Sequence, residues 1–246
     1  MSNALVVDTT IPTPTYGQAR AVPAPPIPGV VDLIDARSLS YPVDAALHAY
    51  PNLIAQGGAY ERDAVHIAPG GATATVQAVA GQTVLQSIPG GGKLGLAAEA
   101  GTAPGACTLV WAGIPSLEAS LGTFGSASVS LKVGTTDTII YNTSGGKATL
   151  THAGSTITHS RVINDGSFHV LIAVLNGTES RLFADGLSRE GTLATTPAGT
   201  RYVLNGEAHK ASPGASTFHF SRFERAITDA EARLVTDWLM GQWANP

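Results

Sequence analysis

The chain of 246 residues contains a single cysteine, Cys107. One thiol excludes an internal disulfide framework of the kind that stabilises small secreted modules. A domain of this length buries roughly 70% of its unfolded surface, so it needs no such cross-links. Cys107 begins the apolar stretch Cys107–Ile114, and free cysteines are among the residues most often buried. We therefore expect Cys107 to be an inert thiol in or near the core.

Charge is also scarce. Only 13% of the residues are charged, against about 25% in a typical domain, and the net charge is −4 with no basic run. Affinity for nucleic acid rests on clustered lysine and arginine, so a nucleic-acid partner is not expected. No apolar run approaches the roughly 20 residues of a membrane span. The first residues, MSNALVVDTT, lack the basic and apolar regions of a signal peptide. The sequence predicts a neutral, hydroxyl-rich surface and no membrane insertion.

Catalytic motifs are missing. A glycosidase needs two carboxylates that flank the bond, and the nearest spacing is Glu61-Arg62-Asp63, at the edge of a predicted loop. We interpret this triplet as a solvated edge. Gly90-Gly91-Gly92-Lys93 lacks the upstream glycine and the hydroxyl residue of a phosphate loop, so it predicts a hairpin loop. There is no G-x-S-x-G motif and no local Cys–His pair. The chain is predicted to be no enzyme, with no catalytic residues and no cofactor.

The seven histidines do not cluster at the spacing of metal ligands. His152 and His159 are isolated, and His169 and His219 lie in predicted strands. Each is interpreted as a structural or surface residue, and a metal site is left open.

What the sequence does contain is alternating apolar segments separated by turn residues. In Phe168–Leu175 both alternating series are apolar, which predicts a strand covered on both faces. Asn176-Gly177 fits a two-residue type I′ turn, and a second turn follows at Asp185-Gly186. Two such turns predict a meander of three antiparallel strands.

Further strands are predicted along the chain, while Tyr41–Gln56 has mixed periodicity and is interpreted as a short helix or irregular loop. The predicted strands are Val30–Ala36, Ala64–Ile67, Ala72–Ala80, Thr83–Ile88, Cys107–Ile114, Ser126–Val133, Thr138–Tyr141, Ala148–His152, Thr156–Val162, Arg201–Leu204 and Thr217–Phe223.

One helix is predicted, at the C-terminus. Thr228 and Glu231 have the spacing of a capping box, in which each side chain bonds the backbone amide of the other residue. An apolar stripe follows and should lie on the sandwich. The stripe consists of Leu234, Val235, Trp238 and Leu239. We interpret Trp238 and Trp243 as core or clamp residues in preference to sugar platforms.

Residues 1–29 form a separate, extended arm with six prolines from Pro12 to Pro28. Proline lacks a ladder donor, so the arm cannot form a central strand. Its composition is that of a disordered tail or linker. The alternative is an assembly arm held by its own domain, a neighbouring copy or another protein.

Two stretches carry a family resemblance. The pattern of Phe168–Gly186 resembles the hairpin "W-H-x-V-x-x-x-x-D-G…x-L-Y-V-D-G" of concanavalin A-like lectin/glucanase and laminin-G-like domains, with Phe168 in place of Trp and Asn176 in place of Asp. The matching residues are Phe168, His169, Val170, Asn176, Gly177, Leu182, Phe183, Ala184, Asp185 and Gly186. Phe218–Leu234 resembles the closing strand and helix cap of the family. Its matching residues are Arg225, Ala226, Ile227, Thr228 and Glu231.

The resemblance covers residues 30–246 and implies an all-β, concanavalin A-like jelly-roll sandwich of two antiparallel sheets, with one C-terminal helix and the Pro-rich arm 1–29. Laminin-G-like domains often bind calcium through loop acids, for which Asp137, Asp165 and Asp185 are candidates, although turn chemistry explains the last two equally well.

The fold serves lectins, adhesion modules and hydrolases alike. We expect a non-enzymatic structural protein of a virion or its appendage, such as a bacteriophage tail, fibre or capsid decoration, and binding of cell-surface glycans is compatible with that role. Its partners would be other virion proteins or copies of itself through the arm, and it would reach the virion from the host cytoplasm. The alternatives are a stand-alone carbohydrate-binding module and, less favoured, a glycoside hydrolase or lyase.

Overall fold

The structure is a computed structural model, and it describes part of the chain. The described residues are 22–38, 46–47, 49–50, 53, 64–66, 74–87, 94–97, 106–115, 127–133, 136–142, 146–152, 154–193, 201–204, 206–207, 210–211 and 216–245. The side chains are described within 22–38, 53, 75–86, 106–115, 146–151, 154–193 and 216–245. Glu61–Asp63, Gly90–Lys93 and residues 1–21 of the arm therefore lie outside the described residues.

The first sheet, sheet A, has nine strands in the order β15-β14-β13-β8-β19-β6-β5-β2, with β1 also paired to β19. All of its pairings are antiparallel. Its strands are β1 (Val30–Asp35), β2 (Ala46–Leu47), β5 (Ala74–Val79), β6 (Gln82–Ser87), β8 (Cys107–Ile114), β13 (His169–Leu175), β14 (Ser180–Ala184), β15 (Leu187–Gly191) and β19 (Ser216–Phe223).

The second sheet, sheet B, has eight strands in the order β12-β11-β10-β9-β16-β7-β4-β3, again all antiparallel. Its strands are β3 (Ala49–Tyr50), β4 (Ala64–His66), β7 (Leu94–Ala97), β9 (Ala127–Val133), β10 (Thr136–Asn142), β11 (Lys147–His152), β12 (Ser155–Val162) and β16 (Arg201–Leu204). The short strands β17 (Gly206–Glu207) and β18 (Lys210–Ala211) pair with each other.

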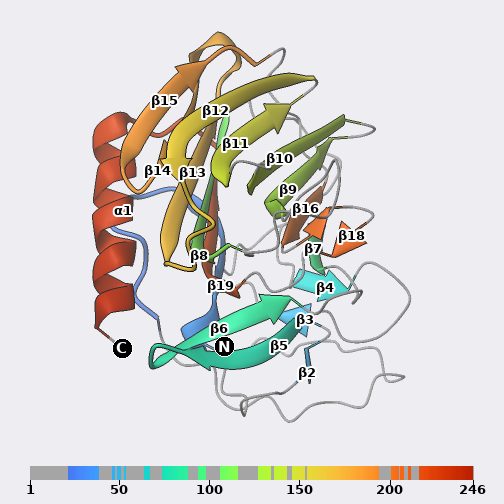
Figure 1. Ribbon diagram of the computed structural model, residues 1–246, viewed down its shortest axis with the longest axis vertical. Coiled ribbons are helices and arrows are strands. Elements are labelled where there is room, and N and C mark those ends of the chain that lie inside the picture. Colours follow the sequence, from blue (N-terminus) through green and yellow to red (C-terminus); the bar gives the residue numbers. More distant parts are fainter. Residues whose placement is uncertain are drawn as a thin grey trace.

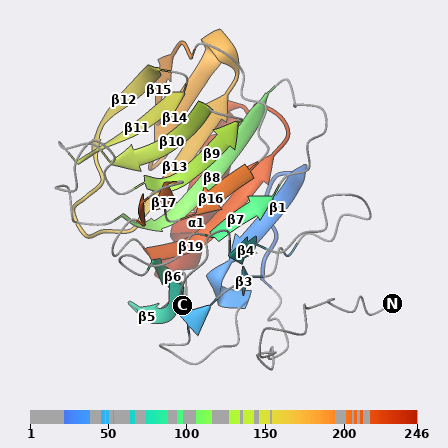
Figure 2. The ribbon, with the colours of Figure 1, turned by 90° about the vertical axis from the view of Figure 1, so that its right-hand side faces the viewer.

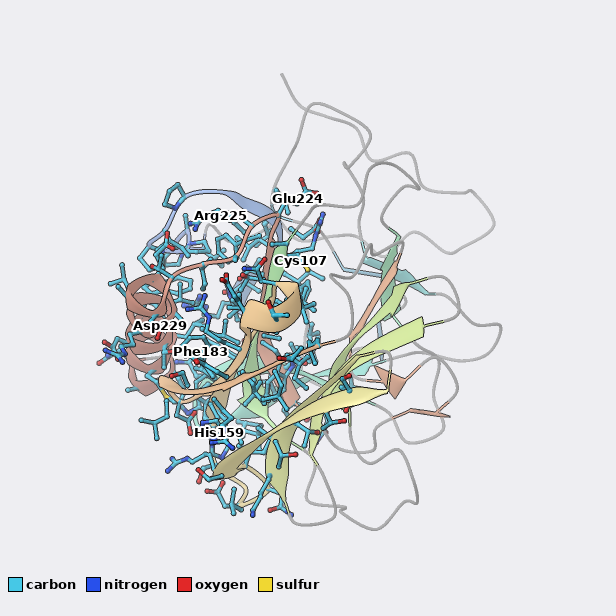
Figure 3. All side chains as sticks on the ribbon, turned by 90° about the horizontal axis from the view of Figure 1, so that it is seen from above. Cys107, His159, Phe183, Glu224, Arg225 and Asp229 are labelled. Atoms are coloured by element: carbon cyan, nitrogen blue, oxygen red, sulfur yellow. The ribbon has the colours of Figure 1, made fainter. Side chains whose placement is uncertain are left out.

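The two sheets and the helix α1 (Asp229–Ala244) form successive layers, with sheet A in the middle (Figures 1 and 3). One core cluster fills the space between the sheets and includes Leu109, Trp111 and Leu150. A second lies between sheet A and α1 and includes Ile172, Phe183 and Val235. All seven residues of β13 are buried, because alternate side chains enter the two cores. The predicted all-β sandwich of two antiparallel sheets with one C-terminal helix is confirmed.

The predicted strands are present, with ends displaced by at most two residues. The interpretation of Tyr41–Gln56 as a helix or irregular loop is wrong where the structure describes it, because Ala46–Leu47 and Ala49–Tyr50 are short strands of the two sheets. β7 carries no signal in the sequence, since Leu94–Ala97 is short and contains a glycine.

The turn predicted at Asn176-Gly177 is wrong in its type. A type I′ turn needs positive φ at both central residues, but Asn176 has φ −146° and starts the 3-10 turn η2 (Gly177–Glu179). The hydroxyl of Ser180 accepts from the Asn176 amide and donates to the Gly177 carbonyl, at 3.0 and 2.7 Å. The second turn is as predicted, because Asp185 and Gly186 both have positive φ, 52° and 81°.

The helix cap is confirmed: Thr228 Oγ1 accepts from the Glu231 amide, and Glu231 accepts from the Thr228 amide at 2.8 Å. The predicted apolar stripe of α1 is wrong at one position. Leu234 is 49% exposed, whereas Val235 and Leu239 are buried together with Ala232. No helix among the described residues has both the length and the apolar character that crossing a membrane requires.

At one edge of the sandwich the two sheets meet, where β12 of sheet B lies beside β14 and β15 of sheet A (Figure 1). Gly191 makes the close approach feasible, since a Cβ atom there would lie 2.6 Å from Cγ1 of Ile157. A register shift between β11 and β12 falls in the same region. Bulges of this kind redirect side chains at sheet edges and near functional sites.

Candidate functional site

Charged and polar side chains gather where β12, the loop before β13 and the β14–β15 turn come together. We call them the edge cluster. It consists of His159, Arg161, Asp165, His169 and Asp185. Two of these residues, His169 and Asp185, belong to the hairpin that carries the family resemblance.

His169 is the centre of the cluster. Its Nδ1 lies 2.8 Å from Oδ2 of Asp185, and its Nε2 lies 2.9 Å from Oδ1 of Asp165. Only an imidazolium can donate to both carboxylates at once. His169 is buried while the side chain of Asp165 is 47% exposed, so the charged network runs from the interior to the surface.

The pKa values in this network shift together. Burial opposes protonation of His169, but its hydrogen bonds to Asp185 and Asp165 and their negative charges outweigh burial and raise the pKa of His169 above its ordinary value. The hydrogen bond from His169 lowers the pKa of Asp165 to about 2. Burial alone would raise the pKa of Asp185, but His169 and the amide of Val170 reverse this effect and lower it.

Asp185 connects three elements. Its Oδ1 accepts from the Val170 amide on β13 at 3.0 Å, and its Oδ2 accepts from Nε of Arg161 on β12, also at 3.0 Å. Its positive φ holds the turn into β15. The carboxylate therefore fixes the edge of sheet B to the meander of sheet A.

His159 has one determined tautomer. Its Nδ1 accepts from the Arg161 amide at 2.9 Å, so Nε2 carries the proton and donates to the Leu187 carbonyl at 3.0 Å. Burial lowers the pKa of His159, which keeps the ring neutral. Its bond across the edge of the sandwich is thus a fixed structural contact.

The structure brings together two of the three calcium candidates. Asp165 and Asp185 converge, but on the imidazole of His169, and Asp165 Oδ1 also accepts from the Ser167 amide at 2.8 Å, as in a turn. Asp137 lies in β10, where side chains are not described. No group of three or more metal-binding side chains occurs in the part of the chain that the structure describes.

A second polar network is fully buried beneath α1. Nδ1 of His219 lies 3.1 Å from Oδ2 of Asp35, and its Nε2 lies 3.1 Å from Oγ of Ser221. The spacing is that of a Ser-His-Asp triad. All three side chains are inaccessible, however, and the ring of Trp238 packs edge-on against His219 at 5.4 Å. A substrate has no access to this hydroxyl, so the network acts as a structural brace.

Asp35 is the anchor of that brace. Burial would raise its pKa, but Arg37 and His219 outweigh burial and lower the pKa of Asp35 to about 2. Arg37 pairs with both carboxylate oxygens and stands over the ring of Phe218 at 4.7 Å. Sequence reasoning missed this network, because its partners are separated by 184 positions and come together only through the pairing of β1 with β19.

The two tryptophans of α1 serve as clamps, as predicted. Trp243 stacks on Phe168 with centroids 4.3 Å apart and meets Phe218 edge-on at 5.3 Å. Trp238 covers His219. Cys107 is buried, and burial raises the pKa of its thiol to about 12, so the thiol is inert as predicted.

Comparisons with known proteins support the fold and assign no family to the chain. No protein-family model matches the chain. No curated protein matches it at a significant level.

Among solved structures, the sialidase of Trypanosoma rangeli in complex with the inhibitor DANA aligns with 89% of this chain at TM-score 0.60 and 15% identity. This alignment covers 35% of the sialidase, so the chain spans about a third of that protein.

Two single domains align as well. Domain 4 of AbnA, a GH43 extracellular arabinanase from Geobacillus stearothermophilus solved in complex with arabinotriose, aligns at TM-score 0.53 and 13% identity, over 68% of this chain and 82% of the domain. The binding domain of Paraclostridial Mosquitocidal Protein 1 aligns at TM-score 0.50 and 12% identity, over 68% of this chain and 46% of that one. At these identities the likeness establishes the β-sandwich fold of the chain.

Proposed function

We propose that this chain is a non-enzymatic, glycan-binding module with a lectin-type sandwich fold. The observation that carries the proposal is the likeness to domain 4 of the arabinanase, which aligns over most of its length and was solved with arabinotriose bound. The alignments with part of a sialidase and with the binding domain of a mosquitocidal protein support the same proposal.

The state of the described carboxylates supports a non-enzymatic role. A glycosidase needs two carboxylates that face the bond and are available for acid, base or nucleophilic work. In the part of the chain that the structure describes, the carboxylates of Asp32, Asp35 and Asp185 are each held by an arginine or histidine. The carboxylates of Asp229 and Glu231 are held in the same way. The partners of Asp35 and Glu231 lower the pKa of each carboxyl to about 2, and the partners of Asp185 also lower its pKa, so these three groups are poor general acids.

The edge cluster is the best candidate for the glycan contact. Sugars are bound by charged groups that exchange directional hydrogen bonds with hydroxyls, next to apolar surface. Arg161 and Asp165 each have side chains that are 47% exposed, and they are held in place by Asp185 and His169 from below. Val162 and Leu187 beside them are 45% and 60% exposed.

The wider role that we propose is a component of a virion or appendage. The sequence supports this role through its weakly charged, hydroxyl-rich composition and its extended arm, through which the chain would join assembly partners or copies of itself. The end of the arm, residues 22–29, lies along the chain's own domain: Ile27 is buried near α1, and the Pro28 carbonyl accepts from Arg225 at 3.1 Å.

A glycan array tests the proposal. The full chain, fluorescently labelled, should bind a subset of microbial surface glycans, and the glycans it binds should stay intact during prolonged incubation. Absence of binding to every glycan would contradict the proposed function. Turnover that disappears in Glu61→Gln or Asp63→Asn would overturn the non-enzymatic assignment in favour of a hydrolase or lyase.

A further inference from the structure

The edge between β12 and β15 contains two arginines and a leucine that face the interior side of the sandwich and yet remain exposed. In the antiparallel pair β14–β15, Leu187 stands opposite Ala184 and Arg189 opposite Leu182. Directly opposed residues share a face of the sheet. Ala184 and Leu182 belong to the core between the sheets, so Leu187 and Arg189 point to the same side, toward β12.

These side chains are not covered by β12. Leu187 is 60% exposed, the largest value among the large apolar residues whose exposure is described, and Arg189 is exposed as well. Further along β15 the two strands touch closely at Gly191 and Ile157. They are also joined at Leu187, whose carbonyl accepts from His159, and at Asp185, which accepts from Arg161. Leu187 and Arg189 therefore lie on an exposed edge along which the two sheets stay in contact.

Arg161 lies on the same exposed edge, on β12. Its Nε donates to Asp185, which leaves its two terminal amino groups without a partner among the described residues. The side chain of Arg189 has no hydrogen bond or ion pair within the described part of the chain. His159 connects the two strands, because its Nδ1 accepts from the Arg161 amide on β12 and its Nε2 donates to the Leu187 carbonyl on β15, two residues before Arg189. Figure 3 shows His159 at this edge of the sandwich.

The charges along this edge sum to a positive value. His169 and Arg161 supply two positive charges against the two negative charges of Asp165 and Asp185, so that Arg189 leaves this group of five residues with a net charge of +1. Glu190 stands opposite Arg181, on the other face of sheet A from Arg189. His159 is neutral. An arginine fork matches the geometry of a carboxylate, and a leucine beside it offers apolar surface to the C–H face of a sugar ring.

We propose that this exposed edge, formed by Arg161, Leu187 and Arg189, binds the carboxylate of an acidic sugar, so that the module selects glycans containing uronic or sialic acids. The inference rests on the proposed glycan-binding function and specifies its substrate class. The competing explanation is that the arginines only guard two sheet edges against pairing with other chains.

Isothermal titration calorimetry on the full chain decides between them. The probes are polygalacturonate, alginate, hyaluronan and polysialic acid, each beside its carboxyl-reduced, neutral form. At least one acidic polymer should bind, and its reduced form should bind about tenfold or more weakly, as the loss of a charged hydrogen bond implies. Arg189→Gln should weaken binding by a similar factor, whereas Arg233→Gln, on the exposed face of α1, should leave it unchanged.

The alternative outcomes separate the two proposals. Equal binding of an acidic polymer and its reduced form, unaffected by Arg189→Gln, would overturn the acidic-sugar inference while leaving glycan binding intact. Binding to neutral glycans on the array, without binding to any acidic polymer, would also overturn the acidic-sugar inference and leave glycan binding intact. Binding to none of these polymers and to no glycan on the array would overturn the proposed function as well. Self-association of Arg189→Gln with unchanged binding would identify the arginine as an edge guard.

Discussion

At the residue scale, Gly191 sets the distance between the two sheets at the edge of the sandwich. A methyl group at this position would lie 2.6 Å from Cγ1 of Ile157, closer than real Cβ contacts occur. Gly191→Ala should therefore force β12 and β15 apart and lower the free energy of unfolding by about 1–3 kcal/mol, as overpacking does. Urea denaturation followed by tryptophan fluorescence measures the change.

Gly241 in α1 supplies the matched control, because nothing lies within 4 Å of a Cβ atom there. Gly241→Ala should raise the stability by roughly 0.5–1 kcal/mol through helix propensity. If the two alanine variants shifted stability in the same direction, the close contact at Gly191 would not be the cause.

His169 should make stability depend on pH. The pKa of His169 is raised in the folded protein, so its contribution is fully present below the unfolded value of about 6.5 and is lost as the pH rises through the folded value. Above that value the neutral ring can donate to only one of Asp165 and Asp185. The pKa of Asp165 is lowered to about 2, so its contribution is lost only in strong acid.

The thermal midpoint of the wild type minus that of His169→Gln should therefore be larger at pH 5.5 than at pH 8.5. The expected increase is about 2–4 °C, which roughly 1 kcal/mol produces in a domain of this size. Asp165 is half-exposed, so its share of the effect is reduced by solvent screening. Thermal melts of both proteins at the two pH values measure the difference. An identical pH dependence in the wild type and in His169→Gln would rule out the imidazolium as its source.

At the element scale, the meander β13-β14-β15 shows what the sequence could predict and where it stopped. Alternation of apolar residues predicted the strands, and Asp185-Gly186 predicted its turn because both residues tolerate positive φ. The turn after β13 was predicted wrongly in type, since the bonds of Ser180 to Asn176 and Gly177 lengthen the connection. The turn propensities of Asn176 and Gly177 could not include the hydroxyl of Ser180, which lies four positions after Asn176.

The candidate site was less predictable than the fold. Asp165 and Asp185 were recognised as loop acids, but their shared partner His169 was interpreted only as a structural or surface histidine in a strand. Asp35 and His219 meet only because β1 pairs with β19 near opposite ends of the chain. Contacts of this kind depend on strand order, which hydrophobic periodicity does not specify.

Helix α1 should depend on its first turn. Glu231 accepts from the Thr228 amide at 2.8 Å and pairs with both amino groups of Arg225 at 3.0 and 2.6 Å. Glu231→Ala should destabilise the fold by about 1–2 kcal/mol, the usual effect of losing a helix cap. Asp237→Ala, exposed on the same helix, should change stability by less than about 0.5 kcal/mol. Chemical denaturation of the two variants compares them, and equal losses would show that the cap contributes nothing specific.

At the scale of the whole molecule, the three layers explain why α1 belongs to the fold. The helix covers the outer face of sheet A through Val235 and Leu239, while sheet B carries no helix among the described residues (Figure 2). Sequence reasoning predicted this arrangement from one apolar stripe, and it erred only at Leu234, where Ala232 is buried instead.

The arm should divide into two parts. Deleting residues 1–21 should leave the thermal midpoint nearly unchanged and should remove assembly with partners or copies of the chain. Deleting residues 1–29 should also destabilise the domain by about 2–4 kcal/mol, because Ile27 is only 5% exposed within the core beneath α1. Light scattering after size exclusion and thermal melts test both deletions. If deletion of residues 1–21 prevented folding, the whole arm would belong to the domain.

The central claim is that the chain binds glycans and does not cleave them. The most direct measurement is capture of a mixed microbial glycan digest on the immobilised full chain, followed by mass spectrometry of the eluted sugars. The account predicts a retained subset of oligosaccharides whose masses equal those in the input. Shortened products in the eluate, or no retained sugar at all, would contradict it.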